Sequence, residues 1–132
     1  MNKKLSYCIL LSTSWQDSIK LDSALKFCCN LLDANHKIQT LFLQYDSVSL
    51  AGVMNIIPDE EVDMGARWQE FVAKNRLNAH VCINSALRRG IVDEAMAKQY
   101  QKPCASISPL FQLSPLGVLF DSMQLADRFV QL

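Results

Sequence analysis

The chain has 132 residues, of which 50% are hydrophobic, so it can bury one sizeable core but is too short for two ordinary domains. Its 13 basic and 13 acidic side chains balance, which argues against a nucleic-acid-binding or membrane-surface protein that works through bulk charge. No stretch approaches the roughly 20 apolar residues that a membrane span needs. We therefore expect a single domain over residues 1–132 that recognises its partners by local surface, without direct membrane contact.

The first residues superficially resemble the start of a signal peptide, because Lys3 and Lys4 precede the apolar run 5–11. The run is at the short end for the hydrophobic region of such a peptide, and no small-residue cleavage site follows it. An amphipathic pattern begins directly after residues 12–15 instead. We therefore interpret the run as part of the domain and expect a cytoplasmic protein.

The first half of the chain predicts two strands around one helix. Residues 5–12 are largely apolar and rich in strand formers, as in a strand that is covered on both faces. Apolar residues then recur at helical spacing over 19–32, behind Asp17 as a possible cap. Residues 38–45 predict the second strand. The segment 46–61 has mixed polarity and predicts a long connection that is a candidate for function.

The middle of the chain predicts a helix, a strand and a second, short helix. The first helix is predicted over 62–74, where the acidic residues 59–61 favour its start through the helix dipole. Its inward-facing residues are predicted to be Met64, Trp68, Phe71 and Val72. Residues 79–83 predict the third strand, and Asn84 or Ser85 is a candidate cap for the short helix that follows.

The last part of the chain continues this alternation. Asp93 is a candidate cap for a helix that runs to Tyr100, and residues 102–107 predict either a fourth short strand or an extended loop. The dipeptide Ser114-Pro115 is typical of a helix start, and residues 129–132 predict the final strand. Strands that alternate with helices predict an α/β fold with a mainly parallel central sheet of about five strands and helices on both faces.

The cysteine pattern favours free thiols. The five cysteines include no Cys-x-x-Cys pair and are accompanied by two histidines, which argues against both a disulfide framework and a zinc site. Glycine-rich phosphate loops of the G-x-G-x-x-G and G-x-x-x-x-G-K types are also absent, which disfavours a nucleotide-binding module. We therefore expect neither a metal nor an organic cofactor.

Cys82 lies at the predicted end of the third strand and directly before a helix start. Reactive groups gather beyond the carboxyl ends of the strands in parallel α/β sheets. Backbone N–H groups and the helix dipole can stabilise a thiolate there, and Arg88 and Arg89 add positive charge. This position suits a nucleophilic thiol that is reachable at the edge of the sheet. A cysteine in an apolar strand is also a common packing residue, so both interpretations stay open.

Two other residues bear on the role of Cys82. Cys104 lies in a predicted loop and is either a second reactive thiol or an incidental loop residue. His80 lies two residues before Cys82, which places both side chains on one face of the strand. It is either a proton acceptor for the thiol or a residue that fills a strand position. Cys8 lies in an apolar strand and is expected to be buried, as is at least one of the helical pair Cys28 and Cys29.

Residues 81–94 (Val-Cys-Ile-Asn-Ser-Ala-Leu-Arg-Arg-Gly-Ile-Val-Asp-Glu) resemble the active-site segment of the DsrE family. The resemblance covers nearly the whole chain and includes residues 66–69, 113–117 and 127–132. Its most specific part is the spacing Cys-x-x-x-Ala-Leu-Arg-Arg-Gly. The family does not require histidine at position 80, and it tends to have glycine or other small residues at or near four positions that differ here: Gln16, Ser47, Asn84 and Ser85.

The resemblance implies a DsrE-like fold and a sulfurtransferase without a cofactor. In such a protein Cys82 would accept sulfane sulfur as a persulfide from a small donor carrier protein and pass it to a downstream acceptor protein. The resemblance also implies assembly with two homologous subunits into a heterohexamer, and a role in 2-thiolation of the wobble uridine of transfer RNA, which is contacted only indirectly. Two alternatives are a non-catalytic assembly subunit of a DsrE-type complex and a relay in dissimilatory sulfur oxidation.

Overall fold

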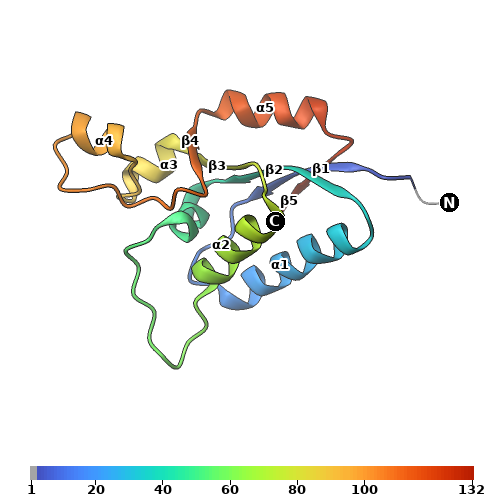
Figure 1. The fold of residues 1–132 in the computed structure, drawn as a ribbon, viewed down its shortest axis with the longest axis horizontal. Coiled ribbons are helices and arrows are strands. Elements are labelled where there is room, and N and C mark those ends of the chain that lie inside the picture. The colour runs from blue at the N-terminus through green and yellow to red at the C-terminus, as the bar shows by residue number, and fades with distance from the viewer. Residues whose placement is uncertain (1–2) are drawn as a thin grey trace.

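Five parallel strands form the central sheet in the computed structural model, which describes residues 3–132 (Figure 1). Their order across the sheet is β4-β3-β2-β1-β5. The strands are β1 (Ser6–Leu11), β2 (Lys37–Leu43), β3 (Ala79–Cys82), β4 (Gln112–Ser114) and β5 (Arg128–Gln131). The predicted α/β fold with a parallel sheet is therefore confirmed. Residues 1 and 2 of the expected domain lie outside the described residues.

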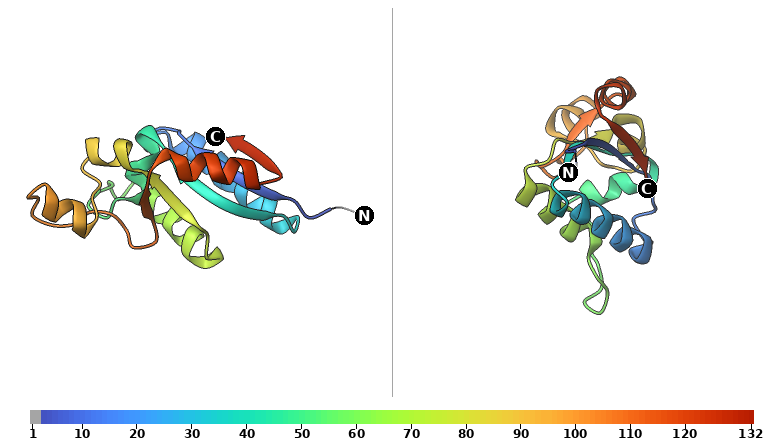
Figure 2. Two further views of the ribbon diagram at one scale, coloured as in Figure 1. Left: turned by 90° about the horizontal axis from the view of Figure 1, so that it is seen from above. Right: turned by 90° about the vertical axis from the view of Figure 1, so that its right-hand side faces the viewer.

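Helices cover both faces of the sheet, as predicted, but unequally. The long helices α1 (Ser18–Asp33) and α2 (Met64–Asn75) lie on one face, and α5 (Leu116–Leu125) crosses the other (Figures 1 and 2). Three shorter helical segments occupy the connections after β2 and β3: η1 (Tyr45–Ala51), α3 (Ile83–Arg88) and α4 (Glu94–Gln99). Within residues 3–132, no helix has the length and apolar character needed to cross a membrane.

Alternate residues of the strands build two apolar cores. On β1, Ile9 and Leu11 belong to the larger core beneath α1 and α2, whereas Cys8 and Leu10 belong to a smaller core beneath α5. Residues 5–12 are apolar without alternation because both faces of this strand are buried. The smaller core consists of Cys8, Leu10, Phe42, Cys82 and Leu119, with Leu116, Val118, Met123 and Ala126 packed against it.

Aspartate side chains cap the N-termini of three helices, α1, α2 and α4. Asp17 and Asp93 each accept a hydrogen bond from a backbone N–H in the first turn, at 3.1 and 2.8 Å, so both predicted caps are confirmed. The start of α2 lies at Met64, slightly later than predicted, because Asp63 takes the cap position. The inward-facing residues predicted for this helix are buried: Met64, Trp68, Phe71 and Val72.

The prediction of a strand over 102–107 is wrong, and the alternative of an extended loop holds. This segment forms one isolated β-bridge, between Gly52 and Ile107, and its other backbone hydrogen bonds, such as those of Ser106 with Val53 and Val92, belong to no strand. The fourth strand is instead Gln112–Ser114, which pairs with β3. A strand of three residues is too short to show an alternating pattern, so only its pairing with β3 defines it.

Two predicted helix starts are also wrong by a few residues. Ser114 belongs to β4, so Pro115 takes the cap position and α5 begins at the next residue. Cys82, rather than Asn84 or Ser85, takes the cap position of α3. In α3 the last residue of the strand is itself the cap, and in α5 a single residue separates the strand from the helix.

Leu21→Ala is expected to lower the free energy of unfolding by about 2–5 kcal/mol, because Leu21 is fully buried in the larger core. Ile19→Ala on the same helix removes a side chain that is 80% exposed, and it is expected to cost less than about 0.5 kcal/mol. Urea denaturation followed by circular dichroism measures both values. Equal costs for the two variants would contradict this orientation of α1 on the sheet.

Candidate active site

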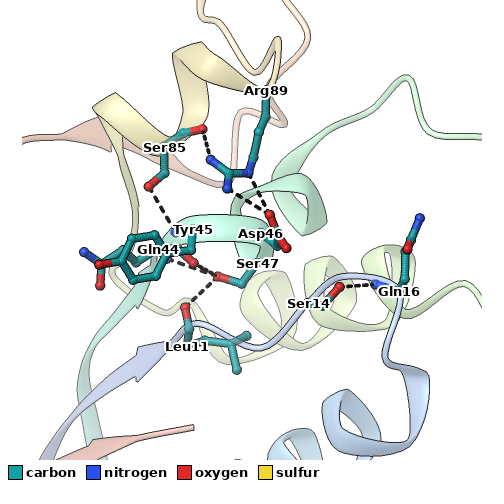
Figure 3. A network of polar contacts seen from close by, with 9 residues as sticks. All are labelled: Leu11, Ser14, Gln16, Gln44, Tyr45, Asp46, Ser47, Ser85 and Arg89. Carbon is teal, nitrogen blue, oxygen red and sulfur yellow. Dashed lines mark hydrogen bonds and ion pairs between the residues drawn. The ribbon is translucent and has the colours of Figure 1, made fainter.

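A polar network joins the segments that follow β1, β2 and β3 at the carboxyl edge of the sheet (Figure 3). The hydroxyl of Ser47, which is fully buried, donates to the carbonyl oxygen of Leu11 at the end of β1. The backbone N–H of Gln44 lies 3.0 Å from the Ser47 oxygen and 2.9 Å from the same Leu11 oxygen. One serine side chain therefore holds the start of η1 against the end of β1.

The same network links η1 to α3. The backbone N–H of Tyr45 donates to Ser85 Oγ at 3.0 Å, and Tyr45 has a φ of 55°, in the left-handed region. The guanidinium of Arg89 contacts Asp46 Oδ1 through two nitrogens, at 2.8 and 3.0 Å, and the carbonyl oxygen of Ser85 at 3.1 Å. These contacts fix the short helix that begins at Cys82 relative to the end of β2.

Three of the positions that depart from the family pattern have defined hydrogen bonds. Ser47 and Ser85 use their hydroxyl groups in the network, which a glycine at either position cannot do. In the first loop, the backbone N–H of Gln16 donates to Ser14 Oγ at 3.3 Å. Serine hydroxyl groups therefore take part in the hydrogen bonds that hold each of these loops.

Cys82 is the last residue of β3 and directly precedes the first turn of α3, where the sequence places it. It is 3% exposed, because it lies in the smaller core with Leu119 and beneath the neighbouring residues of α5. The expectation of a thiol that is reachable from the edge of the sheet is therefore wrong for this conformation. The reason is that α5 begins directly after β4, so its first turn passes over the end of β3.

The positive charge near Cys82 is smaller than the sequence suggests. Arg89 is paired with Asp46, and Arg88 is exposed. Cys82 makes no side-chain hydrogen bond to the first turn of α3, and this helix has six residues, so its dipole is short. The position of Cys82 at the end of a strand, rather than the surrounding charge, distinguishes it.

His80 is buried on the same face of β3 as Cys82. Its Nδ1 lies 2.7 Å from Ser114 Oγ, and its Nε2 lies 2.9 Å from Asn78 Oδ1. The ring stacks on Phe42 of the smaller core, with 6.4 Å between the centroids. Burial lowers the pKa of His80, so the imidazole is neutral at neutral pH. The sequence did not indicate Ser114 as a neighbour, because its dipeptide with proline predicts a helix start.

The four other cysteines occupy different environments. Cys8 and Cys28 are buried, as predicted. Burial raises the pKa of the Cys8 thiol, against a smaller lowering by a hydrogen bond with Ser122. Burial, with a minor contribution from Cys29, raises the pKa of Cys28 to about 12. Cys29 is partly exposed and Cys104 is exposed, so Cys104 is the most accessible thiol.

Other kinds of site receive no support near Cys82. In the described part of the chain, no group of three or more histidine, cysteine or acidic residues is arranged to hold a metal ion. An open cavity of about 640 Å³ lies between the first loop at Trp15 and the segment 49–66. Neither Cys82 nor His80 lines this cavity, so it is separate from the candidate active site.

The fold and the site together define a parallel α/β domain with a cysteine at the carboxyl end of a central strand. Residues 5–132 match the model of the DsrE/DsrF-like family, and the chain belongs to this family. The crystal structure of the YchN protein from E. coli has the same fold, with a TM-score of 0.73 and 18% identity over 98% of this chain and 100% of that chain.

Relatives with higher identity are named as sulfurtransferases. The chain is 33% identical over 127 residues to sulfurtransferase TusD of Photorhabdus laumondii, which covers 96% of this chain and 97% of that protein. It is 32% identical to TusD of Sodalis glossinidius over 127 residues, or 96% and 98% of the two chains. A TusD homolog of Pseudomonas aeruginosa is 39% identical over 107 residues, which cover 81% of this chain and 82% of that protein. With such similarity over nearly its full length, the chain is a sulfurtransferase.

In the folded protein at pH 8, iodoacetamide is expected to modify Cys104 first and Cys28 last. The reason is that Cys104 is exposed, whereas Cys28 is buried and its pKa of about 12 leaves almost no thiolate at this pH. Peptide mass spectrometry measures the rate at each cysteine, and the same reaction in urea serves as the control in which the rates converge. Equal rates at the two cysteines in the folded protein would contradict these environments.

Ser47→Ala is expected to lower the free energy of unfolding by about 0.5–1.5 kcal/mol, because it removes the buried hydroxyl that joins η1 to β1. The matched control is Ser23→Ala on the exposed face of α1, where little change is expected. Chemical denaturation measures both variants. A Ser47→Ala variant as stable as the control would show that the hydroxyl does not hold this edge of the sheet.

Proposed function

We propose that the chain relays sulfur as a persulfide on Cys82. The position of Cys82 carries the proposal, because it lies at the junction of β3 and α3, where parallel α/β sheets place reactive groups. It also lies within residues 81–94, which resemble the active-site segment of the family. Among the described residues, no other cysteine lies at the carboxyl end of a strand.

The reaction uses thiol exchange alone. The Cys82 thiolate attacks the outer sulfur of a donor persulfide, a new S–S bond forms, and the inner sulfur of the donor leaves as a thiolate. The outer sulfur keeps its hydrogen, so the product is a persulfide on Cys82. An acceptor thiolate then attacks this outer sulfur in the same way and releases the Cys82 thiolate. No electrons enter or leave the exchange, so it requires neither a metal nor an organic cofactor.

The burial of Cys82 makes an opening step part of the proposed function. The first turn of α5 covers the thiol, while Phe120 and Leu125 on the same helix are 55% and 75% exposed. A partner that binds these exposed side chains buries apolar area, and it can displace the first turn of α5 as it docks. Between transfers, the covering helix then shields the persulfide from water and from unrelated thiols.

We further propose a cytoplasmic role in 2-thiolation of the wobble uridine of transfer RNA. In this role the chain assembles with two homologous subunits into a heterohexamer, receives sulfur from a small carrier protein and delivers it to a downstream acceptor protein. The apolar side chains exposed on α5 and β5 support subunit contacts: Phe120, Leu125 and Phe129. The balance of 13 basic and 13 acidic residues supports only indirect contact with transfer RNA.

After incubation with a persulfidated donor, intact-mass spectrometry is expected to show one added sulfur atom on the wild-type chain and none at position 82 of Cys82→Ser. The matched control is Cys104→Ser, which removes the exposed thiol and is expected to retain the added sulfur. Peptide mapping locates the modification. Equal labelling of the wild type and Cys82→Ser, or loss of labelling in Cys104→Ser alone, would refute the assignment to Cys82.

The same variants separate catalysis from assembly. In cells that depend on this chain, Cys82→Ser is expected to abolish the thiolated uridine while its complex with partner subunits still purifies intact. Cys104→Ser is expected to leave both unchanged. Normal thiolation with Cys82→Ser would instead identify the chain as a non-catalytic assembly subunit.

A further inference from the structure

Cys82 on β3 and Ser114 on β4 are paired across the sheet. They are Cα partners in the parallel register, so both side chains point to the face covered by α5. Ser114 is 4% exposed and Cys82 is 3% exposed. A serine hydroxyl is therefore the polar group on the strand position directly beside the buried thiol.

The hydrogen bonds of His80 define which atoms carry protons. Asn78 Oδ1 can only accept, so the His80 Nε2 that faces it at 2.9 Å carries the hydrogen. In the neutral ring Nδ1 is then unprotonated, and it accepts from the Ser114 hydroxyl at 2.7 Å. The lone pairs of Ser114 Oγ are left available on its other side. Asn78 is exposed, so the far end of this chain of hydrogen bonds reaches solvent.

We propose that Ser114 and His80 form the proton acceptor of the Cys82 thiol. The inference rests on the proposed function, in which this thiol must ionise before it attacks a persulfide. The Cys82 S–H proton passes to Ser114 Oγ as the Ser114 hydroxyl proton passes to His80 Nδ1. The products are a Cys82 thiolate, an unchanged serine hydroxyl and a His80 imidazolium. The Nε2–H of this imidazolium remains hydrogen-bonded to Asn78 Oδ1. The thiolate that leaves the donor regains a proton from this imidazolium or from solvent.

Few other titratable or charged groups lie near the Cys82 thiol, so the pair of Ser114 and His80 is its nearest source of a counter-charge. In the smaller core, the other titratable side chain is Cys8 on β1, and the remaining members are apolar. On α3, Arg88 is exposed and Arg89 is paired with Asp46; the acidic residue of α5, Asp121, is exposed. A buried thiolate without a counter-charge is unfavourable. The imidazolium of His80 supplies that charge on the same face of β3, and the neutral resting state that burial imposes leaves Nδ1 free to accept.

The test measures the alkylation rate of Cys82 against pH, with peptide mass spectrometry to separate it from the other cysteines. Iodoacetamide is used where the rate is linear in reagent, so that the reaction of the thiol rather than the opening of α5 is followed. His80→Gln and Ser114→Ala are expected to lower the rate at pH 7 by about tenfold and to raise the midpoint of the profile by about one pH unit. Ser114→Thr keeps the hydroxyl and is expected to restore the wild-type profile.

His36→Gln is the matched control, because His36 is the other histidine of the chain and bonds to the backbone N–H of Leu5, away from Cys82. It is expected to leave the Cys82 profile unchanged. A wild-type profile in folded His80→Gln and Ser114→Ala would overturn the proposal. Nitrogen NMR of the wild type is a test that needs no variant: a His80 that is charged at pH 7, or protonated on Nδ1, would also overturn it.

Alkylation requires no sulfur donor, so this experiment is independent of sulfur transfer. Shifted profiles together with failed persulfide transfer would refute the proposed function and retain the proton-accepting pair. Unshifted profiles together with successful transfer to Cys82 would refute the pair and retain the function.

Discussion

The pairing of β3 between β2 and β4 is the constraint on which the site depends. Parallel strands in register end at the same edge of the sheet, and every residue of β3 is buried. This pairing places Cys82 at that edge and beside Ser114, and it brings His80 within hydrogen-bond distance of the same serine. Two elements that follow Cys82 in the chain therefore supply neighbours of the thiol. These elements are β4, which comes after a long connection, and α5, which follows β4.

Burial has opposite effects on the two requirements of a sulfur carrier. A thiol that attacks a persulfide must ionise, and an apolar core disfavours the charged form. A bound persulfide must also be protected until an acceptor arrives, and the same core excludes water and small thiols. In the relay that we propose, the smaller core beneath α5 would meet the second requirement, and the pair of His80 and Ser114 would meet the first. Cys104 illustrates the contrast, because it is accessible but lies in a loop without such neighbours.

The carboxyl edge of the sheet is held by serine side chains rather than by the flexibility of glycine. Ser47 bonds to the end of β1 and Ser85 bonds to the backbone of Tyr45, so the loops around Cys82 have hydrogen bonds that fix their shape. The pair of Arg89 and Asp46 adds a contact between η1 and α3. An exposed ion pair of this kind adds little stability by itself, so its effect is to orient α3 rather than to stabilise the fold.

The sequence alone determined the fold class, the burial of β1, the caps Asp17 and Asp93 and the position of Cys82 at the end of the third strand, because hydrophobic periodicity and helix caps are local signals. It also placed His80 and Cys82 on one face, since strand geometry repeats every second residue. It could not locate β4, whose three residues carry no pattern, and so it missed Ser114. Only the tertiary structure decided that α5 covers the thiol and that Ser114 lies beside it, because both depend on contacts between segments far apart in the chain.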